Sequence, residues 1–313
     1  MNKVVLFRPG SANLEEEFVT IGTEFIVRKA LNANEVLKVY SPYGSSVYKA
    51  LSSISPRLSK VLQLLISSNM REKITYRIKR GRVSNAFEYI RYLPLREYRT
   101  IILSGCMLTY YYVNKDLKFL LDMKDKIDIL LIGVGGESYT RAEVDAVRKF
   151  LIKLRPRLLV ARDLIAFSLY KDFAEHSFNG IDPAFYVSDV FKPPKLQLDY
   201  VLLNFDHINE PKIDFQETLL VRTHSLTKGF PKHWTKQKNF FISDNPYDYL
   251  TLIANAKEVH TDRVHTAVVA ASYGVKWKYY GKSIRRAILD RVKDRDLRRE
   301  KQIMIEFIRS MLT

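Results

Sequence analysis

The chain has 313 residues, of which 47% are hydrophobic, so it can bury the cores of two ordinary domains and is not a disordered protein. Its one cysteine, Cys106, excludes an internal disulfide. The sequence shows neither a cleavable leader nor an apolar run of about 20 residues that could span a membrane. We therefore expect a cytoplasmic protein, either free or bound peripherally at the inner membrane face. Lysines and arginines number 51 against 34 acids, and the net charge of +17 favours anionic partners.

The first part of the chain alternates short apolar runs with helical patterns, which is typical of a parallel sheet covered by helices. Apolar runs predict strands at Val4–Phe7, Glu35–Tyr40, Thr100–Leu103, Ile127–Ile132 and Arg157–Ala161. Apolar residues at helical spacing predict helices at Glu15–Leu31, Ala50–Ile66, Asn114–Met123, Thr140–Leu154 and Leu164–Phe173. The predicted fold class is therefore α/β, with a doubly wound parallel sheet.

A second unit of the same kind follows a linker at Phe191–Lys195, where two prolines can continue neither a helix nor a strand. Its predicted strands are Asp199–Phe205, Glu217–Thr223, Phe240–Ile242, Glu258–Val259 and Val275–Tyr280, and its predicted helices are Pro246–Ala256 and Thr266–Ser272. We predict domains at residues 1–191, with a basic insertion near 67–99, and at 196–282. Residues 283–313 are predicted to form one long basic helix, from Ser283 to Met311, placed to cross back onto the first domain.

Small and polar residues follow several predicted strands, at the points where the strands end. Because the carboxyl ends of parallel strands meet at one edge of a sheet, these residues can approach one ligand. The candidates for substrate binding in this group are Ser104, Gly105, Gly135, Gly136, Arg162 and His224. Asp163 follows Arg162 directly, and it either orients that arginine in a site or forms a purely structural pair with it.

The most informative stretch is Asn255–Gly274, in which a short strand leads into a helix of small apolar residues. Asp262, Arg263 and His265 crowd the turn between the two elements. Free backbone N–H groups and the helix dipole favour an anion at such a place. A fixed cation and an ionisable imidazole two residues apart therefore indicate an anion site with a proton donor. The alternative is a buried corner in which Arg263 pairs with Asp262 or another carboxylate.

Two blocks concentrate the positive charge: Arg71–Arg99, with interleaved tyrosines, and Lys276–Lys301. Basic and aromatic side chains together can bind single-stranded nucleic acid, and they can equally lie on an anionic membrane. A solvated basic face is the third interpretation. The spacing of histidines and acids does not predict a metal site.

Three short motifs occur in the same order and spacing as in a known protein family. Val160–Ser168 carries Arg-Asp after a strand, Asp182–Phe185 is Asp-Pro-Ala-Phe, and Arg263–Gly274 carries Arg-Val-His before small residues and a glycine. In this order and spacing they resemble the polysaccharide pyruvyl transferase family, over roughly residues 133–280. The resemblance implies two Rossmann-like domains that face a cleft, in the arrangement of GT-B glycosyltransferases. The chain departs from the family at Pro9–Asn13, which replaces an Asn-x-Gly-Asp turn, and at Ser104–Cys106, which has one glycine.

The resemblance also implies roles for the candidate residues. Arg162, Arg263 and His265 would line a donor pocket between the domains for phosphoenolpyruvate, with the two arginines on its carboxylate and phosphate and His265 as general acid. Asp163 would orient Arg162, and Asp262 would orient Arg263 or act as a base. The implied acceptor is a sugar of a glycan or of a lipid-linked precursor, and the chemistry requires no cofactor or metal.

Two other functions fit the same residues. A GT-B glycosyltransferase with a nucleotide-sugar donor would use the same cleft and the same anion site. A non-catalytic protein on this fold would bind nucleic acid or membrane through its basic surface, which the charge of +17 and the missing N-terminal turn favour.

Overall fold

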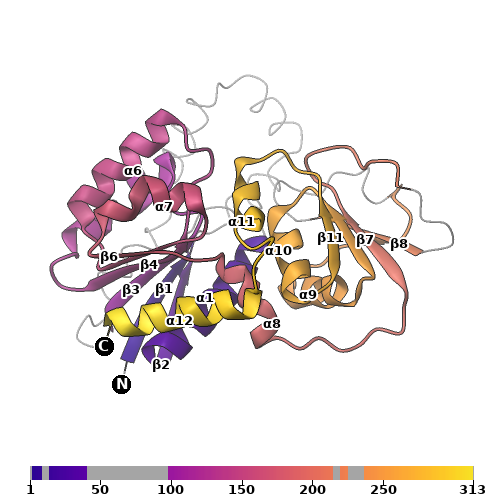
Figure 1. Cartoon of the computed structure of the whole chain (residues 1–313), viewed down its shortest axis with the longest axis horizontal. Helices are drawn as coiled ribbons and strands as arrows, with labels where there is room; N and C mark the ends of the chain where they lie inside the picture. The colour runs from indigo at the N-terminus through magenta and orange to yellow at the C-terminus, as the bar shows by residue number, and fades with distance from the viewer. Residues whose placement is uncertain (1, 9–13, 41–97, 214–218, 225–235, 313) are drawn as a thin grey trace, which may run out of the picture.

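A computed structural model of the protein describes residues 2–8, 14–40, 98–213, 219–224 and 236–312. Two parallel sheets lie beside each other, each with helices packed on it (Figure 1). The predicted helix Ala50–Ile66, the turn Pro9–Asn13 and nearly all of the basic insertion near 67–99 lie outside the described residues. No helix in the described ranges is long and apolar enough to cross a membrane.

The first sheet has six parallel strands in the order β2-β1-β3-β4-β5-β6. They are β1 (Asn2–Arg8), β2 (Ala33–Tyr40), β3 (Tyr98–Gly105), β4 (Asp128–Val134), β5 (Leu158–Ala161) and β6 (His176–Asn179). The helices of this unit include α1 (Glu15–Leu31), α6 (Arg141–Leu154) and α7 (Leu164–Tyr170). The strand order reverses between β1 and β3, and ligands of such sheets bind where the order reverses.

The second sheet has five parallel strands in the order β11-β10-β7-β8-β9. They are β7 (Tyr200–Asn204), β8 (Leu219–Thr223), β9 (Phe240–Phe241), β10 (Glu258–Thr261) and β11 (Lys276–Tyr279), with helices α9 (Pro246–Asn255) and α10 (Val264–Ser272). Here the order reverses between β7 and β10. Both sheets are doubly wound and parallel, so the predicted fold class is confirmed.

Three elements differ from the sequence-based prediction. Strand β6 was not predicted, because its residues are half-buried and form no apolar run. The predicted helix Asn114–Met123 is a π-helical turn, η1 (Tyr112–Asp116), followed by a 3₁₀ helix, η2 (Lys118–Asp122). There the N–H of Leu117 donates to the carbonyl of Tyr112 at 2.9 Å, which widens the turn.

The predicted single helix from Ser283 to Met311 is wrong. The segment forms a 3₁₀ turn, η6 (Ile284–Arg286), a short helix, α11 (Ala287–Asp290), and a long helix, α12 (Leu297–Leu312). The break has a local cause, since the Asp296 carboxylate accepts the N–H of Arg298 at 2.9 Å and starts α12 afresh. Helix α12 packs against α1 and β6, so the chain ends on the first sheet (Figure 1).

One hydrophobic core serves both sheets. Leu6 of β1 and Val259 of β10 belong to the same buried cluster, which also contains residues of α1 and α10. Helix α1 lies against η4 (Pro183–Tyr186), and a Cβ added to Gly22 would lie 1.8 Å from the carbonyl oxygen of Pro183. The opposite face of the first sheet has its own cluster, to which α6 and α7 contribute. The shared core holds the edges where the two strand orders reverse close to each other.

Candidate functional site

The Arg-x-His motif lies where the second sheet reverses its order. The Thr261 hydroxyl, at the end of β10, accepts the N–H of Arg263 at 2.8 Å and donates to the carbonyl of Asn204 at 2.9 Å. In the first turn of α10, Thr266 donates to the side-chain oxygen of Asn204 at 2.7 Å. These bonds tie the turn to the end of β7 and place Arg263 and His265 at the edge that faces α1.

Arg263 is bound by a carboxylate of the first unit. Its Nε and Nη2 donate to the two oxygens of Glu15 at 3.1 and 2.9 Å, and its Nη1 lies 2.7 Å from Nε2 of His207. Burial works against the charge of Glu15, but Arg263 and His265 outweigh it and hold the pKa of Glu15 well below its usual range. Arg263 therefore pairs with a carboxylate, as the alternative interpretation of this turn predicts, and that carboxylate is Glu15 rather than Asp262.

His265 is completely buried between two carboxylates. Its Nδ1 lies 3.7 Å from Glu15 Oε2, and its Nε2 lies 3.5 Å from Asp182 Oδ2. Burial opposes a charged imidazole, but Asp182 and Glu15 outweigh burial and raise the pKa of His265 above its ordinary value. The arrangement favours an imidazolium, which is the form that can give up a proton.

Arg162 is also completely buried, at the end of β5. Its Nη2 donates to the Gly136 carbonyl at 3.2 Å, and its guanidinium lies 3.5 Å from Asp182 and 3.9 Å from Asp163. Within the part of the chain that the structure describes, its Nε and Nη1 make no hydrogen bond beyond these longer ion pairs. Asp163 accepts the N–H of Ala166 at 2.8 Å as the cap of α7, so it is itself fixed beside Arg162.

These contacts form one continuous series of alternating acids and bases. Each neighbour lies within 4 Å of the next, and no side chain in the series is more than 6% exposed. The members in order are Asp163, Arg162, Asp182, His265, Glu15, Arg263, Asp206 and His224. Four carboxylates thus face two guanidiniums and two imidazoles across the boundary between the sheets. Among the described residues, no group of three or more His, Cys, Asp or Glu side chains is arranged to hold a metal ion.

The family model described as polysaccharide pyruvyl transferase matches residues 28–277, which is most of the chain. The chain belongs to the polysaccharide pyruvyl transferase family. The resemblance drawn from the three motifs is confirmed, and the protein is a member of a transferase family. None of the curated proteins compared with the sequence matches it.

Several solved structures that resemble this pyruvyl transferase family member are UDP-GlcNAc 2-epimerases. The UDP-GlcNAc 2-epimerase of Methanocaldococcus jannaschii, in complex with UDP-GlcNAc and UDP, has a TM-score of 0.51 and 14% identity, over 98% of this chain and 92% of the epimerase. The UDP-N-acetylglucosamine 2-epimerase of Rickettsia bellii has a TM-score of 0.51 and 10% identity, over 100% of this chain and 96% of that one. At this identity the likeness shows the fold alone, which is the two-domain GT-B-like arrangement.

Asp262, predicted as a catalytic residue, holds a loop. Its carboxylate accepts the N–H groups of Asp206, His207 and Ile208 at 3.1, 2.6 and 2.8 Å. That loop carries two side chains that flank Arg263. Asp262 therefore fixes the backbone of the loop beside Arg263, and both of its oxygens accept hydrogen bonds.

The two small-residue turns of the first sheet support Arg162. The N–H of Gly135 donates to the Gly105 carbonyl at 3.1 Å, so the ends of β3 and β4 are tied together. A Cβ on Gly135 would lie 2.6 Å from Nε of Arg162, so only glycine lets the guanidinium lie against the turn. Ser104, predicted to bind substrate, lies beneath α1, where its hydroxyl and that of Thr23 share a hydrogen bond of 2.6 Å.

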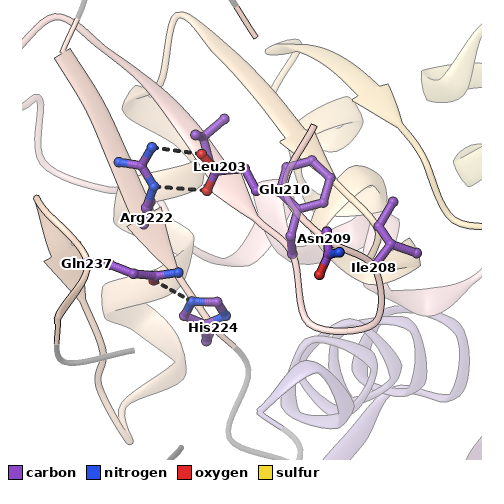
Figure 2. Close-up of a pocket in the computed structure, with 8 residues that line it drawn as sticks. Leu203, Ile208, Asn209, Glu210, Arg222, His224 and Gln237 are labelled. Carbon is purple, nitrogen blue, oxygen red and sulfur yellow. Dashed lines mark hydrogen bonds and ion pairs between the residues drawn. The ribbon is translucent and has the colours of Figure 1, made fainter. Parts of the chain in front are cut away.

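His224 lies at the far end of the series and forms the wall of a pocket. Its Nδ1 lies 2.8 Å from Asp206, and its Nε2 lies 2.8 Å from Gln237. The pocket has a volume of about 200 Å³, and Figure 2 shows Glu210 and Arg222 paired at its edge. The sequence placed His224 in the same site as Arg263, and the structure connects the two through Asp206.

Sequence reasoning missed three side chains of the site. The sequence pattern indicates Glu15 only as the first residue of a helix, and Asp182 only as part of the Asp-Pro-Ala-Phe motif. Arg285 of η6 was one basic residue among many in its block. Its Nε and Nη2 are buried and make no hydrogen bond with the described residues. Its charge opposes protonation of His265, an effect that only the three-dimensional structure reveals.

Proposed function

We propose that the protein transfers the pyruvyl group of phosphoenolpyruvate to two hydroxyls of a sugar, on a glycan or a lipid-linked precursor, and forms a ketal. The observation that carries the proposal is the buried His265 between two carboxylates, one of which, Asp182, also pairs with Arg162. The family membership supports a transferase of this kind. The donor and the roles of the residues are our inference.

The guanidinium groups of Arg162 and Arg285 match the charges of this donor. Phosphoenolpyruvate carries a carboxylate and a phosphate, which guanidinium groups bind through charge-assisted hydrogen bonds. Among the described residues, two nitrogens of Arg285 make no hydrogen bond, and two of Arg162 make only the longer ion pairs with Asp182 and Asp163, at 3.5 and 3.9 Å. Arg263 is occupied by Glu15, so in this proposal it positions Glu15 and, through it, His265.

The reaction needs a proton at the methylene carbon of the donor. His265 would give its proton to that carbon, which leaves a cationic centre at the neighbouring carbon stabilised by the enol oxygen. The first sugar hydroxyl would attack there and return its proton to the imidazole. Phosphate would then leave, the second hydroxyl would attack, and its proton would depart with the phosphate. Glu15 and Asp182, whose pKa values are lowered, would stay ionised and keep His265 charged.

The sugar acceptor would approach from solvent, where the C-terminal segment exposes basic side chains. The basic side chains Lys282, Lys293, Arg298 and Arg299 of the C-terminal segment are exposed, and each could contact an anionic lipid-linked sugar or the membrane that carries it. This surface supports a reaction at the cytoplasmic membrane face, and it remains compatible with nucleic acid as the anionic partner.

Thermal unfolding with added ligands tests the donor. A ligand at 100 times its dissociation constant stabilises the folded state by about 2.7 kcal/mol. We expect phosphoenolpyruvate to raise the melting temperature of the wild type and to have little effect on Arg285→Gln. The neighbouring variant Arg286→Gln is the matched control, because Arg286 is exposed and pairs only with Asp290 in the described structure. A shift with UDP-GlcNAc and none with phosphoenolpyruvate would instead support a nucleotide-sugar enzyme.

A further inference from the structure

The pocket beside His224 has the size of a small ligand. Its volume is about 200 Å³, and the ends of β7 and β8 and the loop after β7 contribute most of its lining (Figure 2). Pockets for drug-sized ligands usually measure about 300–1,000 Å³. This pocket therefore suits a ligand of one ring. It also lies at the carboxyl ends of parallel strands, where doubly wound sheets bind their ligands.

The ionisable side chains of the lining already have partners of opposite charge. Nε and Nη2 of Arg222 donate to the two oxygens of Glu210 at 2.9 and 2.7 Å. Nδ1 of His224 lies 2.8 Å from Oδ1 of Asp206. A phosphate or carboxylate ligand would have to displace Glu210 from Arg222, which is a strong charge-assisted pair. The lining therefore favours a neutral ligand.

Two pairs of hydrogen-bonding side chains line the pocket. Figure 2 shows the Arg222–Glu210 pair above the pair of His224 and Gln237, in which Nε2 of His224 lies 2.8 Å from Oε1 of Gln237. Asn209 adds an exposed amide to the lining. Guanidinium, carboxylate and amide groups together offer both donors and acceptors. Because a hydroxyl also donates and accepts, a ring with several hydroxyls matches this lining.

Among the lining residues that the structure describes, the aromatic rings offer no open stacking surface. Phe205 is 7% exposed, and its ring lies edge-on to that of Tyr280 with the centroids 5.5 Å apart. The ring of His224 is also buried, and its centroid is 5.7 Å from that of Phe240. Proteins hold flat nucleobases largely by stacking them on such rings. The pocket therefore fits a hydroxylated ring better than a nucleobase.

The pocket and the candidate site share a wall. Asp206 contacts His224 on the side of the pocket, and its Oδ2 lies 3.6 Å from Nε of Arg263 on the side of the site. Three backbone N–H groups of the loop after β7 donate to Asp262, which directly precedes Arg263. The turn that carries the Arg-x-His motif thus fixes the loop that lines the pocket.

We propose that this pocket binds one neutral sugar unit of the acceptor, next to the unit that receives the pyruvyl group. A glycan presents several rings in a row, so one ring can occupy the pocket while its neighbour lies at the candidate site. The role as an acceptor subsite rests on the proposed function. The binding of a neutral sugar by this pocket does not.

Saturation-transfer NMR tests the binding, because it detects weak ligands on the intact protein. The probes are the methyl glycosides of glucose, galactose, mannose and N-acetylglucosamine, with the neutral nucleoside uridine beside them. Asn209→Trp fills the pocket from an exposed loop position and leaves the Arg222–Glu210 pair in place. Lys212→Trp is the matched control, because Lys212 is exposed on the same loop and does not line the pocket.

We expect at least one glycoside to bind the wild type and Lys212→Trp. Its dissociation constant should rise about tenfold or more in Asn209→Trp, because the indole takes the place of the sugar ring. If no glycoside bound, or if Asn209→Trp bound as well as Lys212→Trp, the inference would be wrong. Binding of uridine in place of the glycosides would also overturn it and would assign the pocket to a nucleoside.

Phosphoenolpyruvate separates this inference from the proposed function. If a glycoside binds the pocket and phosphoenolpyruvate leaves the melting temperature unchanged, the sugar site stands and the pyruvyl donor fails. If phosphoenolpyruvate raises the melting temperature of the wild type and of Asn209→Trp equally while no glycoside binds, the donor stands and the sugar site fails.

Discussion

Glu15 and Arg263 lie 248 residues apart in the chain and are joined by two parallel hydrogen bonds of 3.1 and 2.9 Å. Glu15 opens α1 of the first unit, and Arg263 stands before α10 of the second. Both side chains are almost fully buried, so each charge depends on the other. The pair connects the reversal points of the two sheets and forms one side of the environment of His265.

Replacing one partner of this pair should destabilise the protein strongly. We expect Glu15→Gln to lower the free energy of unfolding by about 3 kcal/mol, because it leaves Arg263 buried with a neutral partner. Urea unfolding followed by circular dichroism measures the change. The double variant Glu15→Gln with Arg263→Met should lose less than the two single variants together. Additive losses would show that the two side chains do not interact.

The pH dependence of stability should report on His265. Its folded pKa is raised above the unfolded value of about 6.5, so its charge stabilises the folded state fully below that value, and the stabilisation is lost as the pH rises through the folded pKa. The difference in unfolding free energy between wild type and His265→Gln should therefore be largest near pH 5 to 6 and shrink at higher pH. A difference that grows with pH would contradict a protonated His265.

The contributions of Glu15 and Asp182 to stability should change with pH in the opposite direction to that of His265. Their folded pKa values are lowered, so their contribution is present above the ordinary carboxyl pKa and is lost only as the pH falls through the lowered values. Asp182→Asn should thus lose stability at neutral pH, and the loss should diminish in acid. Unfolding of the variant and the wild type from pH 3 to 7 checks the trend; a constant loss would argue for a purely steric effect.

The conformation of the loop beside Arg263, and with it the stability of the protein, should depend on the Asp262 carboxylate. We expect Asp262→Ala to cost about 3 kcal/mol, because three backbone N–H groups lose a charged acceptor. Asp262→Asn keeps one acceptor oxygen and should cost less. Unfolding free energies rank the two variants. If Asp262→Ala were as stable as Asp262→Asn, the carboxylate would not be what holds the loop.

The contact between α1 and η4 gives a test of packing. A Cβ on Gly22 would lie 1.8 Å from the Pro183 oxygen, so Gly22→Ala must push backbone apart and should cost about 3 kcal/mol or more. Gly274→Ala is the comparison, since nothing lies within 4 Å of its Cβ and only its φ of +72° is unfavourable. That variant should lose about 1 kcal/mol. Equal losses would mean that α1 and η4 are not so close.

Much of this fold can be predicted from local patterns. Most strands of the two sheets, though not β6, contain apolar runs that can be recognised in the sequence. The motif at Arg263 and His265 marks the site because it crowds polar groups before an apolar helix. Glu15 and Asp182 escape such reasoning, because the helix dipole and the turn before proline each explain them locally. Arg285 is hidden for another reason, since nothing distinguishes it within its basic block. Their roles depend on contacts between distant parts of the chain.

The alternating series of acids and bases has an evolutionary consequence. Each inner member pairs with two neighbours, so replacing it removes a compensating charge from both, whereas replacing an adjacent acid and base together keeps the net charge of the series unchanged. Sequences that diverge from this one should therefore change these positions in oppositely charged pairs. Glu15 with Arg263, and Arg162 with Asp182, are the pairs in which such joint changes should be sought first.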